Sequence, residues 1–233
     1  MLPARAGWFW LSGRGRASRP VATTGRTEAR TKAWLLLPLL AVFAVLAFPA
    51  TASAANTIVV DTTADNTPTG CSLRAAILAA STDHTQAGCT SGAPGADTIQ
   101  VPAGTYDLSA NFGQLVVSSD MNIIGAGARA TDIRGYALGS RLLEISAGTV
   151  TIRGFTIEGG NETNGSPLPN PGVGGGIWID NPGSLTLQDS MVLGNHADQS
   201  GGGIDNDGTL AVIGSTIEHN TAGCGVISCG FGV

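Results

Sequence analysis

Residues 174–220 repeat one pattern of hydrophobic and polar positions. The segment GGGIWIDNPGSLTLQDSMVLGN, residues 174–195, is followed by GGGIDNDGTLAVIGSTIEHN, residues 201–220. After its glycines, each copy alternates apolar and polar residues and ends on an asparagine. A period of two is typical of β-strands, whose successive side chains point to opposite faces of a sheet. The pattern therefore predicts two short units of strands joined by glycine-rich turns.

A shift of 25 residues superimposes the first copy on the second. Leu185, Leu187, Ser190, Val192 and Asn195 then meet Leu210, Val212, Ser215, Ile217 and Asn220. The same shift places Asp180 and Asn181 on Asp205 and Asn206. Upstream, TVTIRGFTIEGG fits at a shift of 35, with ten extra residues in the loop NETNGSPLPNPGV, and MNIIGAG at 121–127 fits that segment at a shift of 29.

Units of about 25 residues predict a solenoid, in which each unit stacks on the next. We expect a parallel β-helix, because stacked strands place equivalent residues about 4.8 Å apart. Leu185 would then lie over Leu210 in the core, and Asn181 and Asn206 would form a polar ladder. Leucine-rich repeats have a similar period, but the 34 glycines argue against their helical half.

The segment before the repeats follows a different pattern. Residues 56–65, NTIVVDTTAD, predict a first strand, and residues 71–80, CSLRAAILAA, predict an amphipathic helix. The apolar face of that helix consists of Leu73, Ala76, Ile77 and Ala80, and Ser72 is its expected N-cap. Since a solenoid exposes its core at an open end, we expect this helix to cover that end. We expect Arg74 to pair with an acid or to cap carbonyl groups.

Residues 1–54 have the pattern of a leader. The uncharged apolar run at 34–48 follows six arginines and one lysine, and small residues at Ala52 and Ala54 come after it. This arrangement predicts a secretory signal peptide cleaved near Ala54. The alternative is a membrane anchor, but a span needs about 20 apolar residues. We therefore expect a secreted or cell-surface protein with no membrane span after cleavage.

The charge and the cysteines of residues 55–233 exclude some classes of function. Residues 55–233 contain five arginines and no lysine against sixteen carboxylates, a net charge of −11. Such a surface repels phosphate backbones, so we expect no nucleic-acid partner. Outside the cytoplasm, an even number of cysteines favours disulfides, here Cys71 with Cys89 and Cys224 with Cys229. The spacing of the histidines and cysteines does not fit a zinc site.

Two motifs carry a resemblance to a known family. CSLRAAI at 71–77 and GADTIQVPAGTYDL at 95–108, followed by GGGI coils, resemble the bacterial CSLREA-domain family over nearly all of residues 56–233. The resemblance implies a secreted or surface protein with a pectate-lyase-like right-handed parallel β-helix. It makes residues 55–110 a cap module and residues 111–233 the coils. Ala75 stands where the family usually has glutamate. The coils are also similar to those of chlamydial polymorphic outer-membrane proteins, which are adhesins.

Carboxylates in the coils are the candidates for chemistry. If Asp180 and Asp205 are neighbours on adjacent coils, with Asp207 close by, their oxygens could bind calcium. Two of the three could also act as the acid and base of a glycoside hydrolase. We favour a third interpretation, in which these are turn residues bonded to local backbone. The sequence therefore predicts no cofactor, with calcium as the alternative.

Other candidates are isolated residues. Arg134 and Arg153 could serve as the base of a polysaccharide lyase, but neither falls in the register of the aspartates. Trp178, in GIWID, could stack on a sugar, although its apolar neighbours favour a buried or flanking position. Neither observation outweighs the structural interpretation of the coils.

The sequence as a whole favours a non-enzymatic function. We expect a structural, adhesion or carbohydrate-binding module that meets an extracellular polysaccharide or a neighbouring cell surface. The alternative is a polysaccharide-active enzyme, either a lyase or a glycoside hydrolase, or a fragment of one. Because GFGV at 230–233 matches the start of another GGGI unit, we expect an uncapped fragment that self-associates end to end.

Overall fold

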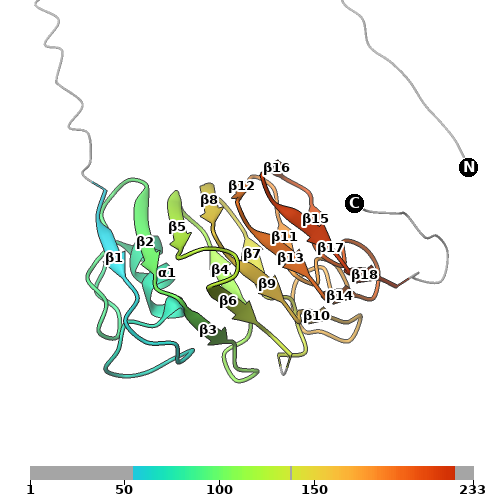
Figure 1. Ribbon diagram of the computed structural model, residues 1–233, viewed down its shortest axis with the longest axis horizontal. Coiled ribbons are helices and arrows are strands. Elements are labelled where there is room, and N and C mark those ends of the chain that lie inside the picture. The colour runs from blue at the N-terminus through green and yellow to red at the C-terminus, as the bar shows by residue number, and fades with distance from the viewer. Residues whose placement is uncertain (1–54, 137, 224–233) are drawn as a thin grey trace, which may run out of the picture. The chain divides into compact units, whose positions relative to one another are not determined.

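The computed structural model describes residues 55–136 and 138–223 (Figure 1). These residues fold mainly into short strands in parallel sheets, with one helix, as expected of an all-β parallel solenoid. The predicted leader and the predicted Cys224–Cys229 bridge lie outside the described residues, as does the GFGV segment.

Four sheets contain the strands, and every pairing is parallel. The six-stranded sheet has the order β1, β2, β5, β8, β12, β16 (Thr57–Val59, Asp97–Val101, Met121–Gly125, Thr149–Arg153, Ser184–Gln188, Thr209–Ile213). The five-stranded sheet has the order β3, β6, β9, β13, β17 (Gly104–Asp107, Thr131–Arg134, Thr156–Glu158, Met191–Leu193, Thr216–Glu218). The four-stranded sheet has the order β4, β7, β11, β15 (Leu115–Val117, Leu143–Ile145, Ile177–Ile179, Ile204–Asn206). The three-stranded sheet has the order β10, β14, β18 (Asn161–Glu162, His196–Ala197, Thr221–Ala222).

The chain visits these sheets in turn, so that successive passes lie side by side (Figure 1). The predicted register of the long strands is confirmed: Leu185 pairs with Leu210 on one side and with Val150 on the other. Val192 pairs with Ile217 in the same way. Alternate residues point inward, and Leu185 and Val192 are at most 1% exposed. The period-two pattern of the sequence therefore marks the core.

Asparagine and serine side chains connect neighbouring passes at the turns. Asn195 Nδ2 donates a 3.0 Å hydrogen bond to Asn220 Oδ1, and Asn195 Oδ1 accepts one of 2.9 Å from the amide of Gly160. Ser215 Oγ accepts from the amide of Ser190 at 3.1 Å. The predicted alignment of these residues is thus confirmed, and each side chain satisfies buried backbone groups that the turn leaves without a strand partner.

The predicted register of the first aspartates is wrong. Asp205 pairs with Trp178 and Asn206 with Ile179, so Asp180 does not pair with Asp205. The turn before β12 has four residues, 180–183, whereas the turn before β16 has two, 207–208. Paired residues of these two units are therefore 27 positions apart in β11 and β15, before the turn, and 25 positions apart in β12 and β16, after it. The expected ladder from Asn181 to Asn206 does not form, and Asn195 with Asn220 provides one instead.

Helix α1 (Leu73–Thr82) covers one end of the stacked strands, as predicted. The Ser72 side chain caps it by accepting from the amide of Ala75 at 3.2 Å. Its apolar face is buried, and the helix packs against β1, β2 and β4. A disulfide joins Cys71, just before the helix, to Cys89 in the segment that follows it, which confirms the predicted bridge.

Candidate functional site

Three side chains form a row on the outer face of the four-stranded sheet. Glu144 on β7 pairs with Trp178 on β11, and Trp178 pairs with Asp205 on β15. Because successive side chains of a strand point to opposite faces, this row lies opposite the buried core residues Leu143 and Ile177.

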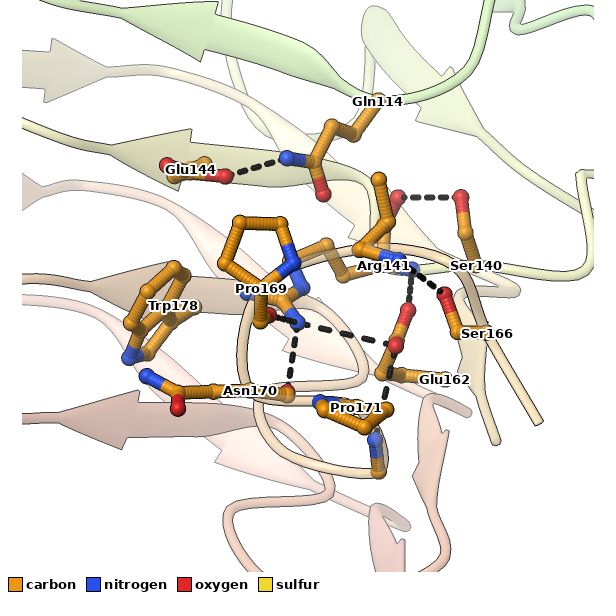
Figure 2. A network of polar contacts seen from close by, with 12 residues as sticks. Gln114, Ser140, Arg141, Glu144, Glu162, Ser166, Pro169, Asn170, Pro171 and Trp178 are labelled. Atoms are coloured by element: carbon orange, nitrogen blue, oxygen red, sulfur yellow. Dashed lines mark hydrogen bonds and ion pairs between the residues drawn. The ribbon is translucent and has the colours of Figure 1, made fainter. Parts of the chain in front are cut away.

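Most of this row lies beneath a loop. Residues 163–176 connect β10 to β11, and the first part of this connection, the loop 163–173, lies against Arg141 (Figure 2). Arg141 Nη2 donates 2.8 Å hydrogen bonds to the carbonyl oxygens of Pro169 and Asn170. Gln199 Nε2 donates a 2.8 Å hydrogen bond to the carbonyl oxygen of Pro171. The loop is therefore held through its backbone carbonyls.

Arg141 is fully buried and forms the centre of this network. Its backbone amide donates to Glu162 Oε2 at 2.8 Å, and its Nη2 lies 3.5 Å from Glu162 Oε1. Its guanidinium carbon lies 4.5 Å from the ring centroid of Trp178. Both charged side chains are 0% exposed, so removing either partner would leave an uncompensated buried charge. The pair therefore fixes the base of the loop to the sheet.

Glu144 is the titratable group with the most distinctive environment in the row. It is 8% exposed and accepts a hydrogen bond from Gln114 Nε2 (Figure 2). Burial raises the pKa of the Glu144 carboxyl, and the charge of Arg141 and the bond from Gln114 offset part of that rise. Gln114 Oε1 and the Nε and Nη1 atoms of Arg141 have no hydrogen-bond partner within the described part of the chain.

Each of the three candidate aspartates accepts a hydrogen bond within the fold. Asp180 Oδ1 accepts from the amide of Asn181 at 2.8 Å, and Asp205 Oδ1 accepts from Ser200 Oγ at 2.7 Å. Asp207 Oδ2 accepts from Trp178 Nε1 at 3.2 Å. Asp180 therefore bonds local backbone as a turn residue does, whereas Asp205 lies in β15 and Asp207 bonds a side chain of the preceding unit. Over residues 55–136 and 138–223, no group of three or more histidine, cysteine or acidic side chains could hold a metal ion.

The other predicted candidates also have structural partners. Trp178 is 2% exposed and Arg141 lies over its ring, so its burial fits a buried flanking position rather than an exposed sugar platform. Arg134 pairs with Glu158 at 2.7 Å, and Arg153 pairs with Asp189 at 3.1 Å. Neither arginine lies beside the aspartates named above.

Sequence reasoning missed Gln114, Arg141, Glu144 and Glu162 as parts of one network. Glu144 could have been found from LLEIS, where a single charged residue interrupts an apolar strand. Arg141 and Glu162 had no periodic signal, because neither residue belongs to the repeated pattern of apolar positions. The ten-residue insertion in NETNGSPLPNPGV was the sequence feature that could have pointed to this region.

No family model, curated protein or solved structure matches this chain. Within the residues that the structure describes, no helix is long and apolar enough to cross a membrane.

Proposed function

We propose that the chain is an exported right-handed parallel β-helix module of the CSLREA type, which acts at the cell surface in adhesion or carbohydrate binding without catalysis of its own. The signal-peptide pattern at 1–54 and the motifs at 71–77 and 95–108 support export and membership of that family. The parallel strands and the covering helix support the β-helix.

One observation carries the non-catalytic part of the proposal. Each of Asp180, Asp205 and Asp207 accepts a hydrogen bond from a neighbouring turn or sheet residue. The buried pair of Arg141 and Glu162 holds the loop 163–173 in place. These groups therefore rigidify a surface, as a binding module requires, because ordering a loop before binding reduces the entropic cost of association.

A second candidate function rests on Glu144. Its raised pKa and the nearby charge of Asp180 are features of a carboxylate pair in which one member stays protonated. A glycoside hydrolase uses such a pair. Against this function, Glu144 is only 8% exposed, so little of its carboxylate is open to a substrate.

The proposal is tested by binding to insoluble polysaccharides. Because residues 55–233 carry a charge of −11, neutral glycans should bind better than acidic ones. Purified residues 55–233 are incubated with cellulose, xylan, chitin and polygalacturonate, and the bound fraction is measured. Retention on a neutral glycan, lost when residues 163–173 are shortened to match the following coil, supports the proposal. Absence of binding to any glycan and to intact cells contradicts it.

Export has its own test. The full chain is expressed with its leader in a bacterial host, and the N-terminus of the extracellular protein is determined by mass spectrometry. We expect a start near residue 55. A chain that stays in the cytoplasm with residues 1–54 intact contradicts the localisation.

A further inference from the structure

The loop 163–173 contains the one place in the chain where an asparagine is followed by a glycine, Asn164–Gly165. Both residues are exposed and form the centre of a turn, which the amide of Ser166 closes by donating to the carbonyl oxygen of Thr163 at 3.0 Å. An asparagine can react with its own backbone, because the amide nitrogen of the next residue can attack the side-chain carbonyl carbon. The product is a five-membered succinimide ring.

The attacking group in this reaction, the backbone amide of Gly165, is accessible. It has no hydrogen-bond partner among the described residues, and nothing lies within 4 Å of the point where a Cβ of Gly165 would stand. Any other residue would place a side chain there, next to the reacting nitrogen. The nitrogen can therefore lose its proton to solvent base and reach the side chain of Asn164 without breaking a contact of the fold.

The group under attack, the side-chain amide of Asn164, is held by a hydrogen-bond donor. Asn164 Oδ1 accepts a 2.7 Å hydrogen bond from Gln199 Nε2, which also donates to the carbonyl oxygen of Pro171 at 2.8 Å. Because the Pro171 oxygen can only accept, Gln199 must present its NH2 group, and Asn164 must present its oxygen. A donor at Oδ1 stabilises the negative charge that this oxygen acquires when the carbonyl carbon is attacked.

We infer that Asn164 is a site of spontaneous deamidation in the folded protein, and that this modification loosens the loop 163–173. The Gly165 nitrogen loses its proton to solvent base and bonds to Asn164 Cγ. The bond from Cγ to Nδ2 breaks, and the NH2 group takes a proton from solvent and leaves as ammonia. Water then adds to one of the two ring carbonyls and opens the ring, which gives aspartate or isoaspartate at position 164. Water is the only co-reactant.

Either product places a new negative charge near Asp198. Asp198 Oδ2 accepts a 2.8 Å hydrogen bond from the backbone amide of Asn164, so the new carboxylate repels a carboxylate that holds this turn. Isoaspartate also routes the main chain through the side-chain carbon, which lengthens the turn between Thr163 and Ser166 by one atom. Gln199 can still donate to the new carboxylate, so the loss falls on the contact with Asp198.

The test follows the purified protein over time at neutral and mildly alkaline pH. Conversion replaces NH2 by OH and is measured as a gain of one mass unit in the proteolytic peptide that contains Asn164. Asn170, an exposed residue of the same loop, is the internal control, because it precedes Pro171 and proline has no N–H to lose. We expect conversion at Asn164 and none at Asn170. Conversion in guanidinium but not in the folded protein would show that the fold protects Asn164 and overturns the inference.

Two substitutions test the chemistry without disturbing the fold. Gly165→Ala preserves the turn, since Gly165 has no positive φ and the space for a Cβ is open, and it should slow conversion at least tenfold. Asn164→Gln keeps the amide but requires a larger ring, and it should show no conversion in the same period. Thermal melts verify that both variants are folded. Equal rates in Gly165→Ala and the wild type would exclude attack by the glycine nitrogen.

The effect on the loop is measured on the converted protein, which its added negative charge separates by anion exchange. We expect hydrogen exchange within residues 163–173 to be at least threefold faster than in the unconverted protein, with β8 and β12 unchanged. Asn164→Asp adds the charge without lengthening the main chain and should give an intermediate rate. Identical exchange in the three proteins overturns the claim that deamidation loosens the loop. These measurements use no glycan, so their outcome does not depend on the proposed function.

Discussion

The guanidinium of Arg141 lies 4.5 Å from the ring centroid of Trp178, and both side chains are at most 2% exposed. The stacking accounts for how an arginine is tolerated in a buried position, since the ring face is electronegative and Glu162 provides the counter-charge. The same guanidinium holds the carbonyls of Pro169 and Asn170. Loop position and core stability are therefore coupled through one residue.

Replacing Arg141 should release the loop. Arg141→Met leaves Glu162 buried without its counter-charge, and we expect a loss of about 3–5 kcal/mol in the free energy of unfolding. Hydrogen exchange should rise within residues 163–173 first. Arg153→Met, at the exposed pair with Asp189, is the control and should cost less than about 1 kcal/mol. Equal losses in the two variants, measured by urea unfolding, would contradict the coupling.

The stability of the protein should depend on the protonation of Glu144. Burial raises the pKa of this carboxyl in the folded state, so folding favours its protonated form. The stabilisation is complete below the ordinary carboxyl pKa and is lost as pH rises through the raised value. Glu144→Gln should remove this fall in the free energy of unfolding. A pH profile of urea unfolding that is identical in the variant and the wild type would contradict the dependence of stability on the Glu144 carboxyl.

The stability contributed by Asp198 should change with pH in the opposite direction to that of Glu144. A hydrogen bond from the amide of Asn164, and then one from His196, lower the pKa of the Asp198 carboxyl. Its stabilisation is present above the ordinary carboxyl pKa and is lost as pH falls through the lowered value. Asp198→Asn should therefore reduce the acid sensitivity of the loop contact, measured as proteolysis at 163–173 between pH 2 and 5. Unchanged acid sensitivity in this variant would exclude Asp198 as the cause.

Two asparagine variants distinguish the ladder that forms, Asn195 with Asn220, from the expected ladder that does not form, Asn181 with Asn206. Asn195 is 1% exposed and bonds the amide of Gly160 and the carbonyl of Ile157, so Asn195→Ala should cost about 2–4 kcal/mol by leaving two buried groups unpaired. Asn206 is exposed, and Asn206→Ala should change the free energy of unfolding by less than about 0.5 kcal/mol. Thermal unfolding of both variants measures the difference. A larger loss of stability in Asn206→Ala than in Asn195→Ala would favour the expected ladder of Asn181 with Asn206 instead.

Much of the fold could be predicted because it is periodic. The pairings of Leu185 with Leu210 and of Val192 with Ile217 follow from residues that recur at one spacing. A turn two residues longer before β12 moved Asp205 onto Trp178, because spacing within a strand carries no information about turn length. The contact between Arg141 and Glu162 could not be predicted, since neither residue belongs to the repeated pattern of apolar positions.

The disulfide should stabilise the capped end. Replacing Cys71 and Cys89 with serine opens a loop of 18 residues, for which we expect a loss of about 3 kcal/mol. In the double variant, hydrogen exchange of the backbone amides should increase in α1 and β1, while the amides of β12 and β16 stay protected. Uniform loss of protection over all strands would show that the cap and the coils unfold as one unit.

The most direct test of the central claim is a depolymerisation assay on residues 55–233. Xylan, polygalacturonate and the best-retained glycan are incubated with the protein, with and without calcium, and new reducing ends and unsaturated products are measured. A module that binds without catalysis produces neither, while glycan retention persists. Sustained cleavage that disappears in Asp205→Ala or Glu144→Gln, with both variants still folded, would contradict the account and establish an enzyme.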